Sequence, residues 1–382
     1  MRLLLTIVLF SALTFRSGVS AQPNGKEDQE PPKALDELAA LGESVLKRLT
    51  FENEKGVWTV YPAGGYSPRT GLEFGLMPIY SWKNKKMKAT AGSINTLSSS
   101  LQGSSKGMIE LRSELDWYPS ADWQLAARVE ALRIYDQYWE AWSLSRPHTT
   151  NNYRASNLGL KTQLLRHLKH RIYIGIHTQI GHQQFEPEDA VLSFSELPGS
   201  SGGWLAGAGP VVVLDRRDHV LYPRKGSYIR ASWTVFQQEK GADFQNYLLD
   251  LRHFIDAGQP VVALQGLWEY GSGDLPFNRL PQLGGKERLR GIGHSKRVVD
   301  QAVWLLRGEL RMPLWWRLGA VAFIETGQAS VRPSFNWNEL IFSQGGGLRF
   351  RILPNEPLHI RIDAAWSSAG TQGLFISLKE AF

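Results

Sequence analysis

Residues 358–366 read LHIRIDAAW and alternate apolar with polar side chains. Neighbouring side chains of an extended strand point to opposite faces, so His359, Arg361 and Asp363 share one face and the apolar residues share the other. The same period of two recurs in four further segments, 109–117, 172–180, 247–255 and 303–312. In each of them one face is apolar and the other carries charged or polar groups. The pattern predicts an all-β protein built from amphipathic strands.

Soluble β-sandwiches alternate in the same way, but three features favour a membrane barrel. The expected strands are about ten residues long and recur about every 20 residues, which suits a tilted crossing of a bilayer. The polar face carries many charges of both signs, as expected of a wet, salt-bridged lumen. Tryptophans lie at expected strand ends, where an interfacial girdle places them, namely Trp82, Trp117, Trp123, Trp315 and Trp316. We therefore predict a transmembrane antiparallel β-barrel over residues 57–382.

About sixteen strands are expected in this region, an even number as in single-chain bacterial barrels. Their predicted ranges are 57–66, 71–82, 91–102, 107–118, 123–136, 153–165, 170–185, 203–215, 226–238, 245–256, 259–271, 300–313, 318–328, 345–353, 357–367 and 373–382. With the amino terminus inside, the connections 137–152, 186–202, 272–299 and 329–344 all face outward. The remaining turns are mostly shorter, which is the asymmetry typical of an outer-membrane barrel.

The amino-terminal part predicts export. Residues 1–21 have the parts of a cleaved signal peptide: a positive start at Arg2, an apolar stretch too short to span a bilayer, and a small-residue site ending at Ala21. Residues 22–56 are expected to form a periplasmic tether with a short helix at 34–49, where apolar residues recur at steps of three and four. That helix is either a docking helix or barrel plug, or a flanking helix without a specific partner.

Composition excludes several other classes. The chain has no cysteine, which excludes a lipoprotein anchor, a disulfide scaffold and thiolate chemistry. The net charge is +7, or +5 without the two arginines of the signal, and the excess is spread along the chain. Such a diffuse excess does not support nucleic-acid binding. Beyond the signal, no stretch approaches the roughly 18 apolar residues that a membrane helix needs.

Three stretches carry more specific information: YPAGGYSPRTGLEFG (61–75), LDRRDHVLYPRKGSYIRASW (214–233) and LGGKERLRGIGHSKRVVD (283–300). The last is followed by LRGELRMPL (306–314) and AFIETG (322–327). In this order they resemble the BamA/TamA family of outer-membrane proteins, also known as the bacterial surface antigen barrel. The resemblance covers most of the predicted barrel and implies the same fold.

The resemblance also implies a site inside the barrel. In that family a long loop folds back into the lumen, and an Arg of its (V/L)RG(F/Y) motif meets acidic groups on the next two strands. Carried over, these residues are Arg290 and Gly291 in the loop, Glu309 in the next strand and Glu325 in the one after it. A guanidinium between two carboxylates can bond both with its planar fork, and Gly291 permits a tight loop tip. There are two departures: Ile292 stands where the family has an aromatic residue, and Glu325 stands where its FxDxG motif has Asp, which keeps the charge on a longer arm.

Two further motifs carry structural predictions. The family's inner turn, closed by Asp hydrogen bonds and shaped by Pro and Gly, is matched by Asp215, Arg217, Asp218, Pro223 and Gly226. In the last strand, alternation places Phe382 on the lipid face with Leu374, Ile376 and Leu378, and Glu380 on that face is a departure. The resemblance implies that the final Phe382 is the signal read by the barrel-assembly machinery.

The sequence shows no catalytic set. The nine His are scattered and no Ser/His pair has a meaningful spacing, so no catalytic, cofactor or metal residues are predicted and the chain is expected not to be an enzyme. Members of the resembled family insert other barrels into the outer membrane or translocate polypeptides or lipids, and usually carry periplasmic POTRA domains. Residues 22–56 are too few for such a domain. The expectation is therefore a barrel-only or accessory member acting on a restricted client.

The expected location is the outer membrane of a Gram-negative bacterium. The expected partners are outer-membrane lipid, the barrel-assembly machinery during biogenesis, and a client polypeptide or subunits of an outer-membrane complex. Gly64 and Gly65 lie in the first strand, where weak pairing with the last strand permits a lateral opening toward lipid. Two alternatives remain: a plain pore or structural barrel, which conductance with the loop in place would favour, and, more remotely, an outer-membrane lipid hydrolase.

Overall fold

The computed structural model describes residues 33–83, 94–139, 150–188, 194–353, 356–378 and 380–382. The predicted signal, the start of the tether and most of the predicted loop 137–152 lie outside the described residues. The described α-helix is α2 (Lys33–Arg48), close to the predicted range 34–49. The strands are β1 (Thr50–Asn53), β2 (Gly56–Ser67), β3 (Gly71–Lys83), β4 (Ile94–Ser104), β5 (Ile109–Ser120), β6 (Trp123–Trp139), β7 (Thr150–His167), β8 (Ile172–Pro187), β9 (Gly203–Asp215), β10 (Gly226–Gln238), β11 (Phe244–Asp256), β12 (Val261–Gly273), β13 (Ala302–Trp315), β14 (Leu318–Ser330), β15 (Ile341–Leu353), β16 (Glu356–Ser367) and β17 (Gln372–Leu378). Short 3-10 turns are η2 (Lys169–Arg171), η3 (Phe194–Glu196), η4 (Phe277–Arg279) and η5 (Trp337–Glu339).

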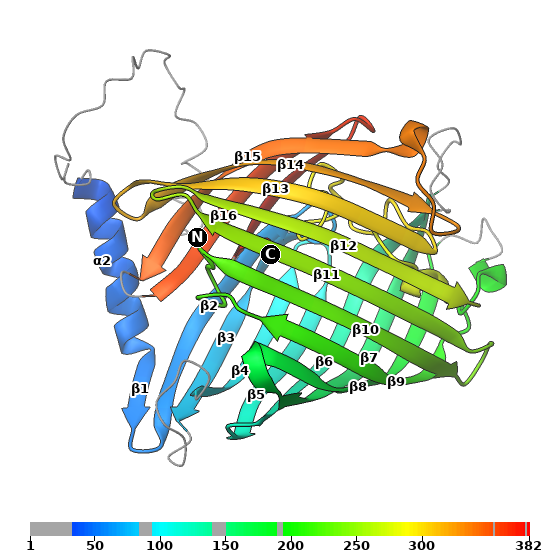
Figure 1. Ribbon diagram of the computed structural model, residues 1–382, viewed down its shortest axis with the longest axis horizontal. Helices are drawn as coiled ribbons and strands as arrows, with labels where there is room; N and C mark the ends of the chain where they lie inside the picture. Colours follow the sequence, from blue (N-terminus) through cyan, green and yellow to red (C-terminus); the bar gives the residue numbers. More distant parts are fainter. Residues whose placement is uncertain (1–32, 84–93, 140–149, 189–193, 354–355, 379) are drawn as a thin grey trace.

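Sixteen of these strands, β2 to β17, form a closed antiparallel barrel (Figure 1). Each strand pairs with the next one along the chain, and β17 pairs with β2 to complete the ring. The remaining strand, β1, forms a small hairpin with β2, in which Thr50 lies opposite Thr59. The predicted fold class and number of barrel strands are confirmed, and β1 was not predicted.

Alternation decides which side chains line the lumen. On β13 and β14, Leu306 is 55% exposed and Ile324 is 71% exposed on the outer wall. On β16, Arg361 and Asp363 are almost fully buried and point inward. An apolar outer surface with a charged interior is the opposite of a soluble protein, and it is what a lipid-facing barrel requires.

The two ends of the barrel differ. We call the end that carries the long connections after β6, β8, β12 and β14 the loop end, and the opposite end, where α2 lies, the turn end (Figure 1). At the turn end α2 is tied to the barrel by an ion pair between Glu43 and Arg317. Among the described residues, no helix is long and apolar enough to cross a membrane.

The predicted last strand, 373–382, is wrong at its carboxyl end. The strand β17 ends at Leu378, and residues 380–382 turn into the barrel. Continued alternation would place the Glu380 carboxylate on the lipid face, which is unfavourable. Inside, Glu380 forms an ion pair of 2.8 Å with Arg349, and the Phe382 ring lies 6.2 Å from the ring of Phe254. The predicted lipid-facing position of Phe382 is therefore wrong.

Candidate functional site

Residues 274–301, which connect β12 to β13, fold into the barrel at its loop end. Four apolar side chains of this segment, which we call the lumen loop, are fully buried: Leu283, Leu289, Ile292 and Val298. They form one core with inward side chains of the barrel wall, Val303, Leu305, Ala329 and Ile341. Ile292, which stands where the resembled family has an aromatic residue, thus fills an apolar core position. This core fixes the stretch of backbone that carries Arg290.

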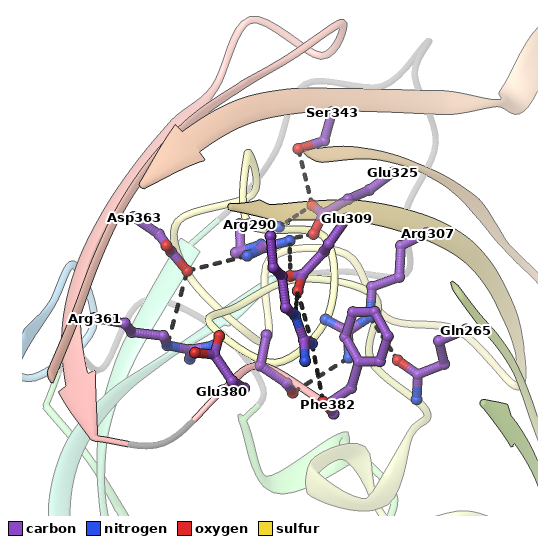
Figure 2. A network of polar contacts seen from close by, with 12 residues as sticks. Gln265, Arg290, Arg307, Glu309, Glu325, Ser343, Arg361, Asp363, Glu380 and Phe382 are labelled. Carbon is purple, nitrogen blue, oxygen red and sulfur yellow. Dashed lines mark hydrogen bonds and ion pairs between the residues drawn. The ribbon is translucent and has the colours of Figure 1, made fainter. Parts of the chain in front are cut away.

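Arg290 lies at the centre of a buried network of charges (Figure 2). Its Nε is 2.7 Å from Oε1 of Glu325, and its Nη2 is 2.7 Å from Oε1 of Glu309. Its Nη1 is 3.0 Å from Oδ2 of Asp363, on β16. The guanidinium also lies over the ring of Phe323, with its carbon 3.3 Å from the ring centroid. One planar cation thus connects β13, β14 and β16 to the lumen loop.

These charges have no contact with bulk water. Arg290 and Asp363 are 0% exposed, Glu309 is 2% exposed and Glu325 is 3% exposed. Burial alone would lower the pKa of Arg290, but Glu309, Glu325 and Asp363 outweigh it and raise that pKa above its ordinary value. The structure therefore brings together the loop arginine and both acids named from the sequence. It adds Asp363, whose inward position was visible in the alternation of 358–366 but whose contact was not predicted.

Two glycines make this close approach possible. A Cβ at Gly291 would lie 2.7 Å from Ser343 Oγ and 2.7 Å from the backbone of Trp366, so a side chain would push the loop off the wall. The Gly291 N–H donates to that same Ser343 hydroxyl at 2.9 Å. A Cβ at Gly347 would lie 2.1 Å from the Asp363 carboxylate. Gly291 is thus explained by contact with the barrel wall, whereas the sequence suggested a tight loop tip.

The network continues to the end of the sequence. Glu309 also pairs with Arg311 at 2.8 Å, and the Arg311 guanidinium donates to the backbone oxygen of Phe382 at 3.2 Å. The carbon of the Arg307 guanidinium lies 4.2 Å from the centroid of the Phe382 ring, and that of Arg311 lies 5.2 Å from it. Figure 2 shows this ring inside the barrel beside Arg307. Cation–π contacts of this kind stabilise a ring in a charged surrounding.

A second anchor of the lumen loop lies across the lumen from Arg290. Asp136, an inward side chain of β6, is 3.0 Å from Lys296 Nζ and 3.4 Å from His294 Nε2. Arg69, in the turn between β2 and β3, reaches the same carboxylate at 2.6 Å, and the Tyr153 hydroxyl donates to it at 3.1 Å. The sequence did not predict this cluster, because it joins residues far apart in the chain.

The turn at residues 215–226 is locally ordered at the turn end. Arg217 pairs with Asp215 at 2.7 Å, and Asp218 Oδ1 accepts hydrogen bonds from the backbone N–H of Arg224 at 3.0 Å and of Lys225 at 3.3 Å. At the end of the turn, Gly226 has a φ of +106°, a conformation in which a side chain is strained, and Pro223 is buried. These contacts are those of a structural turn.

The seam between β17 and β2 is the weakest junction in the wall. Among the described residues these strands share a single residue pair, Ile376 with Tyr66, whereas β16 and β17 pair along seven positions from Trp366 to Ile360. At Gly65 a Cβ would lie 2.7 Å from the Ile376 carbonyl oxygen.

In the described part of the chain, no group of three or more His, Cys, Asp or Glu side chains is placed to hold a metal ion.

A closed barrel with an apolar outer wall, and a loop held by a buried arginine in its lumen, defines an outer-membrane β-barrel. Residues 90–373 match the model of the Omp85 superfamily domain, and the chain belongs to this superfamily. A search of curated proteins gives no significant match.

Solved structures agree with this fold. BamA from Haemophilus ducreyi lacking POTRA domains 1-3 is 12% identical, with a TM-score of 0.58 over 86% of this chain and 71% of that one. CdiB from Acinetobacter baumannii is 10% identical, with a TM-score of 0.56 over 86% of this chain and 60% of that one. CdiB from Escherichia coli is 12% identical, with a TM-score of 0.56 over 84% and 62% of the two chains. The chain thus spans less than two thirds of the CdiB proteins.

Proposed function

We propose that this barrel inserts a polypeptide client into the outer membrane, or passes it across, by engaging the client at the seam between β2 and β17. The observation that carries the proposal is the single residue pair at this seam, whereas every other junction of the described wall pairs along at least seven positions. Unpaired backbone groups are costly in lipid, and an open strand edge readily pairs with another strand. A client strand could therefore form hydrogen bonds with the backbone N–H and C=O groups that β2 and β17 do not pair with each other.

The lumen loop supports this proposal. Arg290 holds the loop to β13, β14 and β16, so the lumen is filled at the loop end while the seam remains weak. In a plain pore an obstructed lumen has no evident use. Membership of the Omp85 superfamily, together with the resemblance to families that insert or translocate other chains, points in the same direction.

The absence of native cysteine allows a direct test. Tyr66 and Ile376 lie opposite each other, so the double substitution Tyr66→Cys/Ile376→Cys forms a disulfide that locks the seam when oxidised. The matched control is Ala127→Cys/Thr162→Cys, an opposed pair between β6 and β7, where the wall is already closed. We expect oxidation to abolish client insertion for the seam pair, to leave the control pair active, and to be reversed by reductant.

A photo-crosslinking probe identifies the client and separates the alternatives. Placed at Tyr66, it should capture a polypeptide, whereas the same probe at Leu160, on the lipid-facing wall of β7, should not. Insertion that continues with the seam locked would contradict the proposal. If no client is crosslinked and the seam disulfide leaves solute conductance unchanged, the protein is a pore or structural barrel.

A further inference from the structure

A cavity of about 880 Å³ lies in the lumen beneath the lumen loop. Four of the cations that line it pair with a carboxylate: Arg69 and Lys296 share Asp136, Arg128 pairs with Glu114 and Arg288 pairs with Glu269. Three other lining cations, Lys161, Arg230 and Arg279, have no carboxylate within ion-pair distance among the residues that the structure describes. Two further carboxylates, Asp116 and Glu130, also line the cavity, so with Asp136 five carboxylates face seven cations and a local excess of positive charge remains.

Arg279 is held rigidly at the edge of this cavity. It lies in η4, where Phe277 is anchored by rings of the wall and of the neighbouring loop, 4.9 Å from Phe185 and 5.3 Å from Phe194. With the Gln179 amide oriented so that its oxygen faces Arg279, that oxygen accepts from Nη1 at 2.8 Å and Nη2 at 3.0 Å. Its Nε is buried without a hydrogen-bond partner in the described part of the chain.

The energetics of Arg279 are unfavourable without a counter-charge. Burial lowers its pKa to about 10, and Glu130 opposes this only in part. A buried cation costs free energy unless an opposite charge or a full set of hydrogen bonds compensates it. Among the described residues, the Gln179 amide is the hydrogen-bond partner of this guanidinium, and the Glu130 carboxylate acts on it from beyond ion-pair distance.

The other two cations converge on the same region. Lys161 on β7 lies in register beside Gln179 on β8, the residue that contacts Arg279. Arg230 reaches across from β10, and its Nη1 donates to Gln163 Oε1 at 2.6 Å. Gln163 is two positions from Lys161 on the same inward face, roughly 7 Å away in a strand. Three cations from two strands and the lumen loop thus border one polar space.

We propose that this space binds a phosphate group between Lys161, Arg230 and Arg279. A tetrahedral oxyanion presents enough oxygens to bond an amine and two guanidinium forks at once, which a single carboxylate does not. The amide side chains of Gln163 and Gln179 supply further neutral donors at the same place. Inorganic phosphate and a phospholipid headgroup share this chemistry. The site is independent of whether the seam engages a client.

The test is calorimetric titration of the purified barrel, in a phosphate-free maltoside detergent, with sodium phosphate at constant ionic strength. We expect saturable binding at one site. Lys161→Gln and Arg279→Gln should each weaken it by about tenfold or more, the usual effect of losing one hydrogen bond to a charged group. The matched control is Arg128→Gln, next to Lys161 in the same wall but paired with Glu114, which should weaken binding by less than about threefold. Among the described residues Lys161 forms no hydrogen bond or ion pair with the lumen loop, so its variant tests the site even where Arg279→Gln disturbs that loop.

Two ligands distinguish the source of the phosphate. The first is glycerophosphoglycerol, the soluble headgroup of phosphatidylglycerol. If it binds at least as tightly as inorganic phosphate, the ligand of the site is a lipid headgroup. Binding of inorganic phosphate alone supports the free ion. In either case the variant pattern must hold. The proposal is overturned if neither ligand binds saturably, or if Arg128→Gln weakens binding as much as Arg279→Gln, since that result would mean a diffuse positive field without a site.

Discussion

Replacing Arg290 with Ala would remove the only cation within ion-pair distance of Glu325 in the described residues. Glu309 would keep Arg311 at 2.8 Å, and Asp363 would keep Arg349 at 2.6 Å. Glu325 would retain only neutral donors, the Ser343 hydroxyl at 3.1 Å and the backbone N–H of residue 290 at 2.7 Å. The three acids are therefore not affected equally, and most of the cost falls on Glu325.

The magnitude follows from burial. Removing one partner of a buried ion pair costs about 3–5 kcal/mol, because the other charge stays buried without compensation. A water-filled lumen would reduce this cost, but Arg290 is 0% exposed and Glu325 is 3% exposed, so water does not screen the pair. A loss of about 3 kcal/mol in docking the lumen loop corresponds to about 100-fold more of the open form. The backbone pairing between the wall strands does not involve Arg290, so the variant should still insert.

Protease sensitivity measures the open form directly. In proteoliposomes, where loop opening is fast relative to cleavage, the rate at which proteinase K cuts the lumen loop tracks the open population. We expect about a 100-fold faster cut for Arg290→Ala. Adding Glu325→Gln should restore part of the protection, because it removes the uncompensated charge. Arg290→Lys should also be only partly protected, since an ammonium cannot hold three carboxylates in one plane.

The matched control is Arg288→Ala, two residues away in the same loop. Arg288 pairs with Glu269 at 2.6 Å, but both side chains are about one fifth exposed. Such a pair contributes roughly 1 kcal/mol or less, so this variant should be cut at most about fivefold faster than wild type. If Arg290→Ala is cut no faster than Arg288→Ala, the buried network does not hold the loop and the reasoning fails.

Three other predictions follow from the same structure. Phe382→Ala should destabilise the barrel by about 3 kcal/mol, because a buried ring and its cation contacts are lost. An unchanged unfolding temperature of this variant on a heat-modifiability gel would contradict the prediction. Phe382→Asp should lower the amount of inserted barrel far more than the amount of exported protein. Burial lowers the pKa of His294, although Asp136 opposes the shift. The imidazole therefore binds a proton less readily when the lumen loop is docked than when it is released. The docking free energy that is present at pH 7 should be lost as pH falls below about 6.5. Hydrogen exchange of residues 290–297 should rise accordingly, and His294→Gln should remove that pH dependence. Asp218→Ala should cost about 1 kcal/mol in urea unfolding, because backbone N–H groups of its turn lose their acceptor while water partly replaces it.

Much of the fold was predictable because a barrel strand has only two faces. Alternation assigned Glu309 and Asp363 to the lumen, and the segments 109–117 and 303–312 lie as predicted. The rule failed at the end of β17 because period two describes a strand only while the strand lasts. Glu380 indicated the failure, since a charge on the lipid face is unfavourable. Its partner Arg349 lies in the predicted strand 345–353, but the local sequence does not show that the two side chains meet.

The site was less predictable from local pattern. Resemblance to a family supplied Arg290, Glu309 and Glu325 together, whereas Asp363 required the three-dimensional position of β16 beside the loop tip. The second anchor at Asp136 was invisible for a stronger reason. It joins β6 to the lumen loop and to a turn after β2, and no local spacing encodes such contacts.

The two anchors explain how a seam with one residue pair stays closed. On the β17 side, the Thr371 hydroxyl, in the turn before β17, donates to the Gly291 carbonyl oxygen at 2.6 Å. On the β2 side, Arg69 and Lys296 share the Asp136 carboxylate. The lumen loop therefore bridges the seam from within at the loop end. The closure of the seam therefore rests on separate side-chain contacts, which can break one at a time. A backbone ladder, in contrast, opens only when many hydrogen bonds are lost together. Release of the lumen loop can thus lower the barrier to opening the seam without unfolding the wall.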